Sequence, residues 1–167
     1  MKRALLLFVS LLLISSVAMA DHIGIYSDAS GSSCVLAPGF TTSAVVVHKF
    51  TTGTTGSLFG ISTAHAPGSA IFSFSSPYET LCINPPCPYS YGACVQSIVV
   101  GTITGILVAG GYLEVVGAGT LATPVALDCS QADHPATGGR GLIASSGDCE
   151  PLAVENSTWG SVKALYR

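Results

Sequence analysis

The stretch GACVQSIVVGTITGILVA, residues 92–109, decides the fold of this chain. Valine, isoleucine and threonine dominate it, and these β-branched residues favour extended backbone. It contains no charged residue, so the strand that it predicts is expected to be covered on both faces. Gly101 and Gly105 interrupt the run, and we expect the strand to bend or break near one of them.

Part of the same region also allows a membrane-spanning helix, because residues 98–113 carry no charge. That stretch is shorter than the about 20 residues needed to cross a bilayer. Glycine occupies four of its positions, and neither end carries Lys or Arg, although spanning helices usually have basic flanks. Buried strands are therefore the better interpretation, and no membrane span is expected in the exported part of the chain.

Working outward from this run, the sequence predicts several more short strands and one irregular loop. The TTGTTG motif at residues 51–56 is expected to be a hairpin connection. Residues 77–90 hold four prolines and two cysteines and predict an irregular loop. The other predicted strands are 22–28, 42–50, 57–63, 69–75, 112–116, 124–129 and 138–146. Strands at this spacing predict an all-β domain over residues 21–150, a disulfide-stapled β-sandwich that is Ig-like or jelly-roll-like.

The first twenty residues predict export. Lys2 and Arg3 provide a positive start, residues 4–14 form an apolar run, and residues 18–20 form an A-x-A site before Asp21. Together these features are typical of a secretory signal peptide, with an N-terminal signal helix that is removed on export. The mature protein is therefore expected to be secreted, in the periplasm or the extracellular space.

The charge of the exported part argues against a nucleic-acid partner. Two of the six basic residues lie in the signal, so four basic residues remain against nine acidic ones, a net charge of −5 with neutral histidines. Four cations cannot build the basic surface that binds a phosphate backbone. The low charge and high β-branched content also favour a folded sheet over disorder.

All six cysteines follow the signal, which indicates up to three disulfides in an oxidising compartment. The expected pairs are Cys82–Cys87, Cys129–Cys149 and Cys34–Cys94. The first would close a tight proline-stiffened loop, the second would staple a glycine-rich stretch, and the third would be a long-range clamp. A zinc site is the alternative for three consecutive cysteines (Cys82, Cys87, Cys94), but their spacing lacks a C-x-x-C knuckle.

The C-terminal end differs from the rest of the chain and is assigned to a linker and helical tail over residues 151–167. Residues 158–167 predict a short amphipathic helix with basic residues in its last turn. Its apolar residues at helical spacing are Trp159, Val162, Leu165 and Tyr166. Such a helix is marginal alone and must dock, either on its own sandwich or on a partner. Trp159 is then a plug in the core or an anchor in a partner's groove.

Several motifs resemble a group of exported bacterial proteins that end in T-W-G-x-[IV]-K-x-L-Y-R after a cysteine-bearing β domain. The tail of this chain, STWGSVKALYR at 157–167, is the specific part of the resemblance. The other matching segments are 21–26, 91–94, 97–100, 126–130 and 136–139. The resemblance implies a bacterial, exported, mostly β protein, and it brings no activity and no catalytic residue with it.

Catalytic motifs are missing from the sequence. No G-x-S-x-G elbow occurs, and an even set of cysteines outside the cytosol is expected to be paired rather than nucleophilic. The candidate metal ligands are Asp128, Asp133 and His134, with His65 as a distant fourth. Solvated loop residues explain them better, so neither a metal nor a cofactor is expected. His48 is expected to be a surface or half-buried strand residue.

The leading hypothesis is an exported, non-enzymatic structural or interaction module of the cell envelope or extracellular space. Its partner would be an envelope or extracellular protein or a glycan. A carbohydrate-binding module is one alternative, with tyrosines as stacking platforms: Tyr26, Tyr78, Tyr89, Tyr91 and Tyr112. A hydrolase with an unrecognised site is the other.

Overall fold

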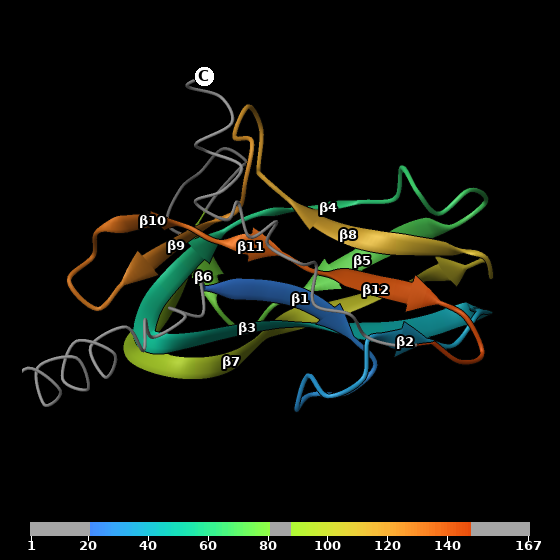
Figure 1. The fold of residues 1–167 in the computed structure, drawn as a ribbon, viewed down its shortest axis with the longest axis horizontal. Helices are drawn as coiled ribbons and strands as arrows, with labels where there is room; N and C mark the ends of the chain where they lie inside the picture. The colour runs from blue at the N-terminus through green and yellow to red at the C-terminus, as the bar shows by residue number, and fades with distance from the viewer. Residues whose placement is uncertain (1–20, 81–87, 148–167) are drawn as a thin grey trace, which may run out of the picture.

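The computed structural model describes residues 21–80 and 88–147, and this part of the chain is all-β (Figure 1). It contains no helix, and therefore none long enough to cross a membrane. Two sheets form a sandwich-like arrangement, which confirms the predicted fold class. The predictions for the signal, for the Cys82–Cys87 pair and for the C-terminal helix lie outside the described residues.

The larger sheet has eight strands and the smaller sheet has four. The larger sheet contains β1 (His22–Tyr26), β3 (Gly39–Leu58), β5 (Ala70–Ser75), β6 (Glu79–Thr80), β7 (Tyr89–Leu107), β9 (Val125–Asp128), β10 (Asp133–Pro135) and β11 (Thr137–Gly138). The smaller sheet follows the order β2 (Val35–Leu36), β12 (Arg140–Ile143), β8 (Gly111–Val116) and β4 (Gly60–Ser62). The core between the sheets is aliphatic, and Ile23, Ile25, Val46, Leu113 and Ile143 are fully buried.

The antiparallel pair of β3 and β7 forms the centre of the larger sheet. Strand β7 covers the run that dominates the sequence, and β5 and β6 pair with it as β3 does. Val46 pairs with Gly101 but Val47 pairs with Val99, so one residue of β7 is bulged out next to Gly101. The predicted irregularity near Gly101 is confirmed. A side chain at Gly101 would meet the Phe74 ring at 2.5 Å.

The predicted hairpin at residues 51–56 is wrong, because β3 runs through this segment to Leu58. The pairing register shifts between Lys49 and Thr54, and Gly53 takes a φ of +98°. Thr54 pairs with β7 on one side and with β9 on the other. Two neighbouring strands thus provide backbone hydrogen bonds to a segment whose composition is typical of a turn, and a bulged strand results.

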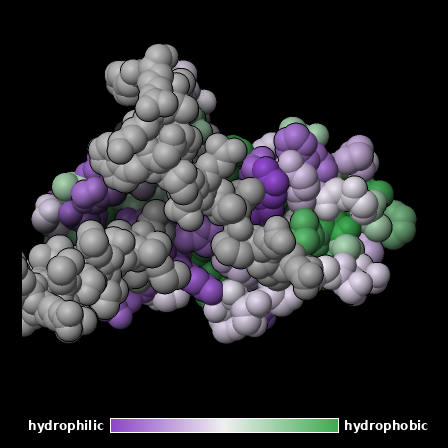
Figure 2. Space-filling model, in the orientation of Figure 1, coloured by the Kyte–Doolittle hydropathy of each residue, from purple (hydrophilic) through white to green (hydrophobic). Residues whose placement is uncertain are grey.

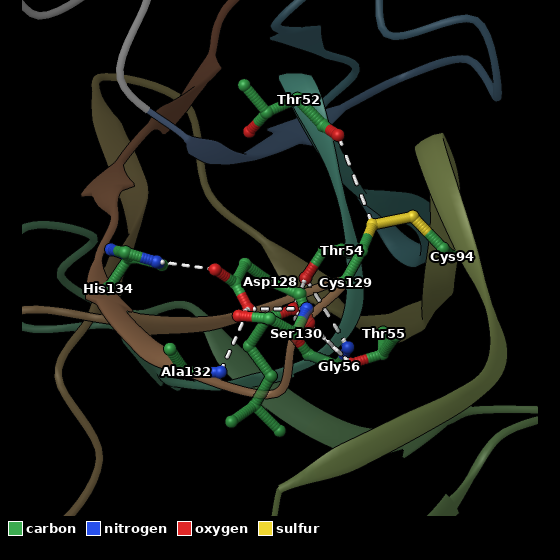
Figure 3. The surroundings of a disulfide bond; sticks show 11 residues. Thr52, Thr54, Thr55, Gly56, Cys94, Asp128, Cys129, Ser130, Ala132 and His134 are labelled. Carbon is green, nitrogen blue, oxygen red and sulfur yellow. Dashed lines mark hydrogen bonds and ion pairs between the residues drawn. A yellow bond between two sulfur atoms is a disulfide. The ribbon is translucent and has the colours of Figure 1, made fainter.

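The disulfide pairing also differs from the prediction. Cys94 bonds to Cys129, with Cα atoms 5.3 Å apart (Figure 3), so the predicted pairs Cys34–Cys94 and Cys129–Cys149 are wrong. Cys94 precedes Val95 and Cys129 follows Asp128, and both of those neighbours pair with Thr54 of β3. The bond therefore spans the bulge in β3, which cysteine spacing alone cannot reveal. Cys34 is also disulfide-bonded.

Candidate functional site

The Asp128 carboxylate organises the turn that joins β9 to β10 (Figure 3). One oxygen accepts hydrogen bonds from the backbone N–H and hydroxyl of Ser130, at 2.8 and 2.7 Å, and from the Ala132 N–H at 2.8 Å. The other oxygen lies 2.9 Å from His134 Nε2. These bonds, that of the Ser130 hydroxyl first, hold the pKa of Asp128 well below its usual value.

The structure joins only two of the predicted metal ligands. Asp128 and His134 are within hydrogen-bond distance of each other, whereas Asp133 pairs with Leu127 in the β-ladder and lines a separate hollow. His65 stacks on Tyr112. Within residues 21–80 and 88–147, no three His, Cys, Asp or Glu side chains form a group that could hold a metal ion.

The arrangement around Asp128 does not match a catalytic triad. In a triad the histidine lies between the serine and the aspartate and carries the proton. Here Ser130 and His134 each bind the same carboxylate, so the aspartate is the centre of the cluster. The geometry therefore stabilises a turn and offers no relay to an attacking hydroxyl.

A second polar cluster lies inside the sandwich and was missed in the sequence. His48 is fully buried, which corrects the prediction of a surface or half-buried residue, and its Nδ1 lies 3.0 Å from the Tyr91 hydroxyl. That hydroxyl also hydrogen-bonds the Ser57 hydroxyl. Burial, with a smaller effect of His22, lowers the pKa of His48 to about 3. Burial raises the pKa of Tyr91, so both side chains are neutral at ordinary pH.

The tyrosines proposed as sugar platforms are each packed against another side chain. None of the five is fully exposed, and Tyr91 is buried. The contacts are Tyr26 with Lys49, Tyr78 with Tyr91, Tyr89 with Phe59, and Tyr112 with both His65 and Arg140. At Tyr112 the ring centroid is 4.7 Å from the His65 ring and 4.5 Å from the Arg140 guanidinium carbon. These contacts do not favour the carbohydrate-binding alternative.

Exposed apolar side chains gather at one end of the larger sheet. Phe40 is 84% exposed, Phe72 is 61% exposed and Val108 is 42% exposed; we call these three residues the apolar rim. Phe40 and Phe72 occupy register shifts in β3 and β5, on either side of the last residues of β7, and Val108 directly follows that strand. Figure 2 shows hydrophobic surface gathered at the end of the molecule where β2 and β12 finish in Figure 1.

The sequence around the apolar rim is almost free of charge. Between Asp28 and Glu114, Lys49 and Glu79 are the only Asp, Glu, Lys or Arg residues. This stretch supplies β3, β5 and β7. The scarcity of charge in this stretch is the feature of the sequence that could have indicated an exposed apolar surface. Edge strands of soluble proteins are normally protected by charged side chains.

A second apolar feature is a hollow beside β9, with a volume of about 320 Å³; we call it the β9 pocket. Its lining residues are Leu58, Pro88, Leu121, Val125, Leu127 and Asp133. No motif in the sequence connects these residues, because they come from separate segments of the chain.

Comparisons with known proteins identify no family for this chain. No protein-family model matches it, and no curated protein matches its sequence. Among solved structures it is similar to a cohesin module from a Clostridium perfringens ATCC13124 family 33 glycoside hydrolase. That match has a TM-score of 0.44 and 9% sequence identity, and covers 75% of this chain and 97% of the other. Similarity at this level does not bear on function.

Proposed function

We propose that this chain is an exported, non-enzymatic interaction module that works in the cell envelope or extracellular space. The observation that carries the proposal is the apolar rim, in which two exposed phenylalanines flank the end of β7. Aromatic side chains are enriched at protein interfaces and charged ones are depleted from their centres. An exposed apolar cluster in an uncharged region is therefore suited to contact with another protein.

The disulfide and the polar clusters are consistent with this proposal. The Cys94–Cys129 bond suits an oxidising compartment. The hydrogen bonds of Asp128, and those that join His48 to Ser57 through Tyr91, stabilise the fold. The working part is thus a surface of the domain, and its partner is an envelope or extracellular protein.

The test compares binding by the purified exported chain and by a double variant, Phe40→Ser with Phe72→Ser. Both side chains are exposed, so the variant is expected to fold like the parent while retention on immobilised envelope and extracellular protein of the source cells falls at least several-fold. Leu121→Ser is the matched control, because Leu121 is a 41% exposed apolar residue outside the rim. Equal retention of the parent and the double variant would refute the proposal.

A further inference from the structure

We propose that the C-terminal tail, residues 158–167, docks as an amphipathic helix in the β9 pocket of its own chain. The proposal does not depend on the function of the apolar rim. It rests on the apolar floor of the pocket, on the charge at its edge and on the reach of the chain beyond residue 147.

The floor of the β9 pocket, formed by Leu58, Val125 and Leu127, is apolar. The outer face of a sheet that meets water is normally polar. Ser57 pairs with Ala126, and both are fully buried on the core side. The next pair, Leu58 with Val125, must face the opposite side, because successive side chains of a strand alternate. Leu127, two residues beyond Val125, faces the same way. An outer face built of aliphatic residues favours a covering apolar element.

The tail carries apolar residues that match this floor. Trp159, Val162 and Tyr166 follow the i, i+3, i+7 spacing that places residues on one face of a helix, and Leu165 borders that face. A helix with such a stripe binds by laying it into an apolar groove. Because a ten-residue helix is marginal in isolation, the pocket would also stabilise the helix.

The charges at the pocket favour the same occupant. Asp133 is exposed and lines the pocket, and Asp128 lies on the adjoining turn. Partial burial raises the pKa of Asp21; the Asp128 carboxylate adds to this rise and His134 opposes it. Asp21, Asp128 and His134 therefore share one neighbourhood, and Asp133 adjoins it as the residue before His134. Carboxylates outnumber the single histidine there.

The basic residues of the exported chain point to the tail as the complement of this acidic edge. Lys49 donates to the Gly31 carbonyl at 2.6 Å, and Arg140 donates to Glu114 at 3.1 Å. The two remaining basic residues are Lys163 and Arg167, both in the tail. An exposed ion pair contributes little to stability, so these charges would orient the helix, while apolar burial would supply most of the binding free energy.

The chain that follows residue 147 is long enough to bring the tail to the β9 pocket. The described chain runs from Asp133 through β10, β11 and β12 to Ile143 (Figure 1), a path of at most roughly 35 Å for an extended chain. It then turns, and at Gly147 it lies against Leu142. The segment 148–157 can span roughly 35 Å as well. It can therefore return residue 158 to the end of the molecule that holds the pocket.

Trp159 is the only tryptophan of the chain, so its fluorescence in the exported protein reports directly on docking. We expect a blue-shifted emission and slow quenching by acrylamide at every protein concentration. Leu121→Asp and Asp133→Lys should each raise the quenching constant several-fold without changing the circular dichroism of the sheets. Adding Lys163→Glu to Asp133→Lys should restore much of the protection, because the reversed charges again attract. Phe40→Ser with Phe72→Ser is the control and should leave the quenching constant unchanged.

The outcomes separate this proposal from the proposed function. The docking proposal would be overturned if Trp159 fluorescence in the parent were quenched as fast as in the urea-unfolded chain. It would also be overturned if the pocket variants had the same quenching constant as the parent. Protection that disappears on dilution would also overturn it, because the occupant would then be the tail of another copy. Loss of protection in the rim variant alone would show that the helix docks elsewhere. None of these results changes the expected binding through the rim.

Discussion

His48 is a polar residue in the middle of β3 that is fully buried. Its Nδ1 is satisfied by the Tyr91 hydroxyl, which in turn contacts Ser57. The buried imidazole keeps its neutral form, because burial penalises the charged form and lowers its pKa. The same feature makes the stability of the fold sensitive to acid.

We expect the free energy of unfolding to fall as the pH drops below about 6.5. The unfolded chain then protonates His48 with an ordinary pKa of 6.5, whereas the folded chain resists protonation down to about 3. At pH 5 this difference amounts to a loss of about 2 kcal/mol relative to neutral pH. His48→Gln, which can still hydrogen-bond Tyr91, should remove this part of the slope in urea titrations between pH 7 and pH 5.

Three other groups, His22, Asp28 and Asp128, also make the stability depend on pH. The pKa of His22 is also lowered, by burial and then by Lys49, so a smaller slope of the same sign should persist in His48→Gln. Asp28 and Asp128 have lowered pKa values and lose their stabilising charge only in stronger acid. An unchanged slope between pH 7 and pH 5 in His48→Gln would contradict the assignment.

At the scale of elements, β3 combines pairing to three strands with one strongly irregular segment. It pairs with β1 and β9 along different lengths and with β7 throughout. Gly53 lies in the irregular segment, where a Cβ atom would approach the sulfurs of Cys94 and Cys129 to 2.8 and 2.9 Å. The glycine thus satisfies both a backbone requirement, its φ of +98°, and a steric one.

The chain offers a matched pair that separates these two requirements. Gly110 has a φ of +93° but has nothing within 4 Å of the position of a Cβ atom. Gly53→Ala and Gly110→Ala therefore share the backbone strain, and only the former crowds the disulfide. We expect Gly53→Ala to lose about 1–3 kcal/mol more than Gly110→Ala in denaturant unfolding. Equal losses of unfolding free energy in the two variants would show that the disulfide can move away from a Cβ atom at residue 53 without destabilising the fold.

For the whole molecule, the cross-link between Cys94 and Cys129 holds β7 to the end of β9 across the irregular part of β3. Closing a loop over a sequence separation of 35 residues contributes about 4 kcal/mol in the chain-entropy treatment. That estimate is large against the total stability of about 5–15 kcal/mol of a typical domain. The sandwich is therefore expected to depend on oxidation.

The position of Cys34 predicts how the remaining cysteines pair in disulfides. It precedes Val35 of β2, and a Cβ atom at Gly147 would lie 3.9 Å from the Val35 side chain. Cys149 comes two residues later, within reach of the about 5.5 Å that a disulfide needs between Cα atoms. We therefore predict Cys34–Cys149, which leaves Cys82–Cys87 as expected from sequence. Mass spectrometry of unreduced peptides tests this, and a peptide joining Cys34 to either of the other two cysteines would contradict it.

The sequence by itself determined the class of the fold. The run at 92–109 predicted the strand that dominates the larger sheet and its irregularity beside Gly101, because β-branched residues restrict the backbone locally. Most of the other strands were predicted within a few residues for the same reason. The sequence also singled out Asp128 and His134, which are close in the chain, and the structure brings these two side chains together.

Only the tertiary structure decided which distant segments meet. Pairing on both sides turned the TTGTTG segment into a bulged strand and brought Cys94 opposite Cys129. The burial of His48 and the aliphatic floor of the β9 pocket depend on which face of β3 points inward. A shift of one residue reverses the faces of a strand at no local cost. Pairing between strands is a long-range property, and the composition of a single segment does not encode it.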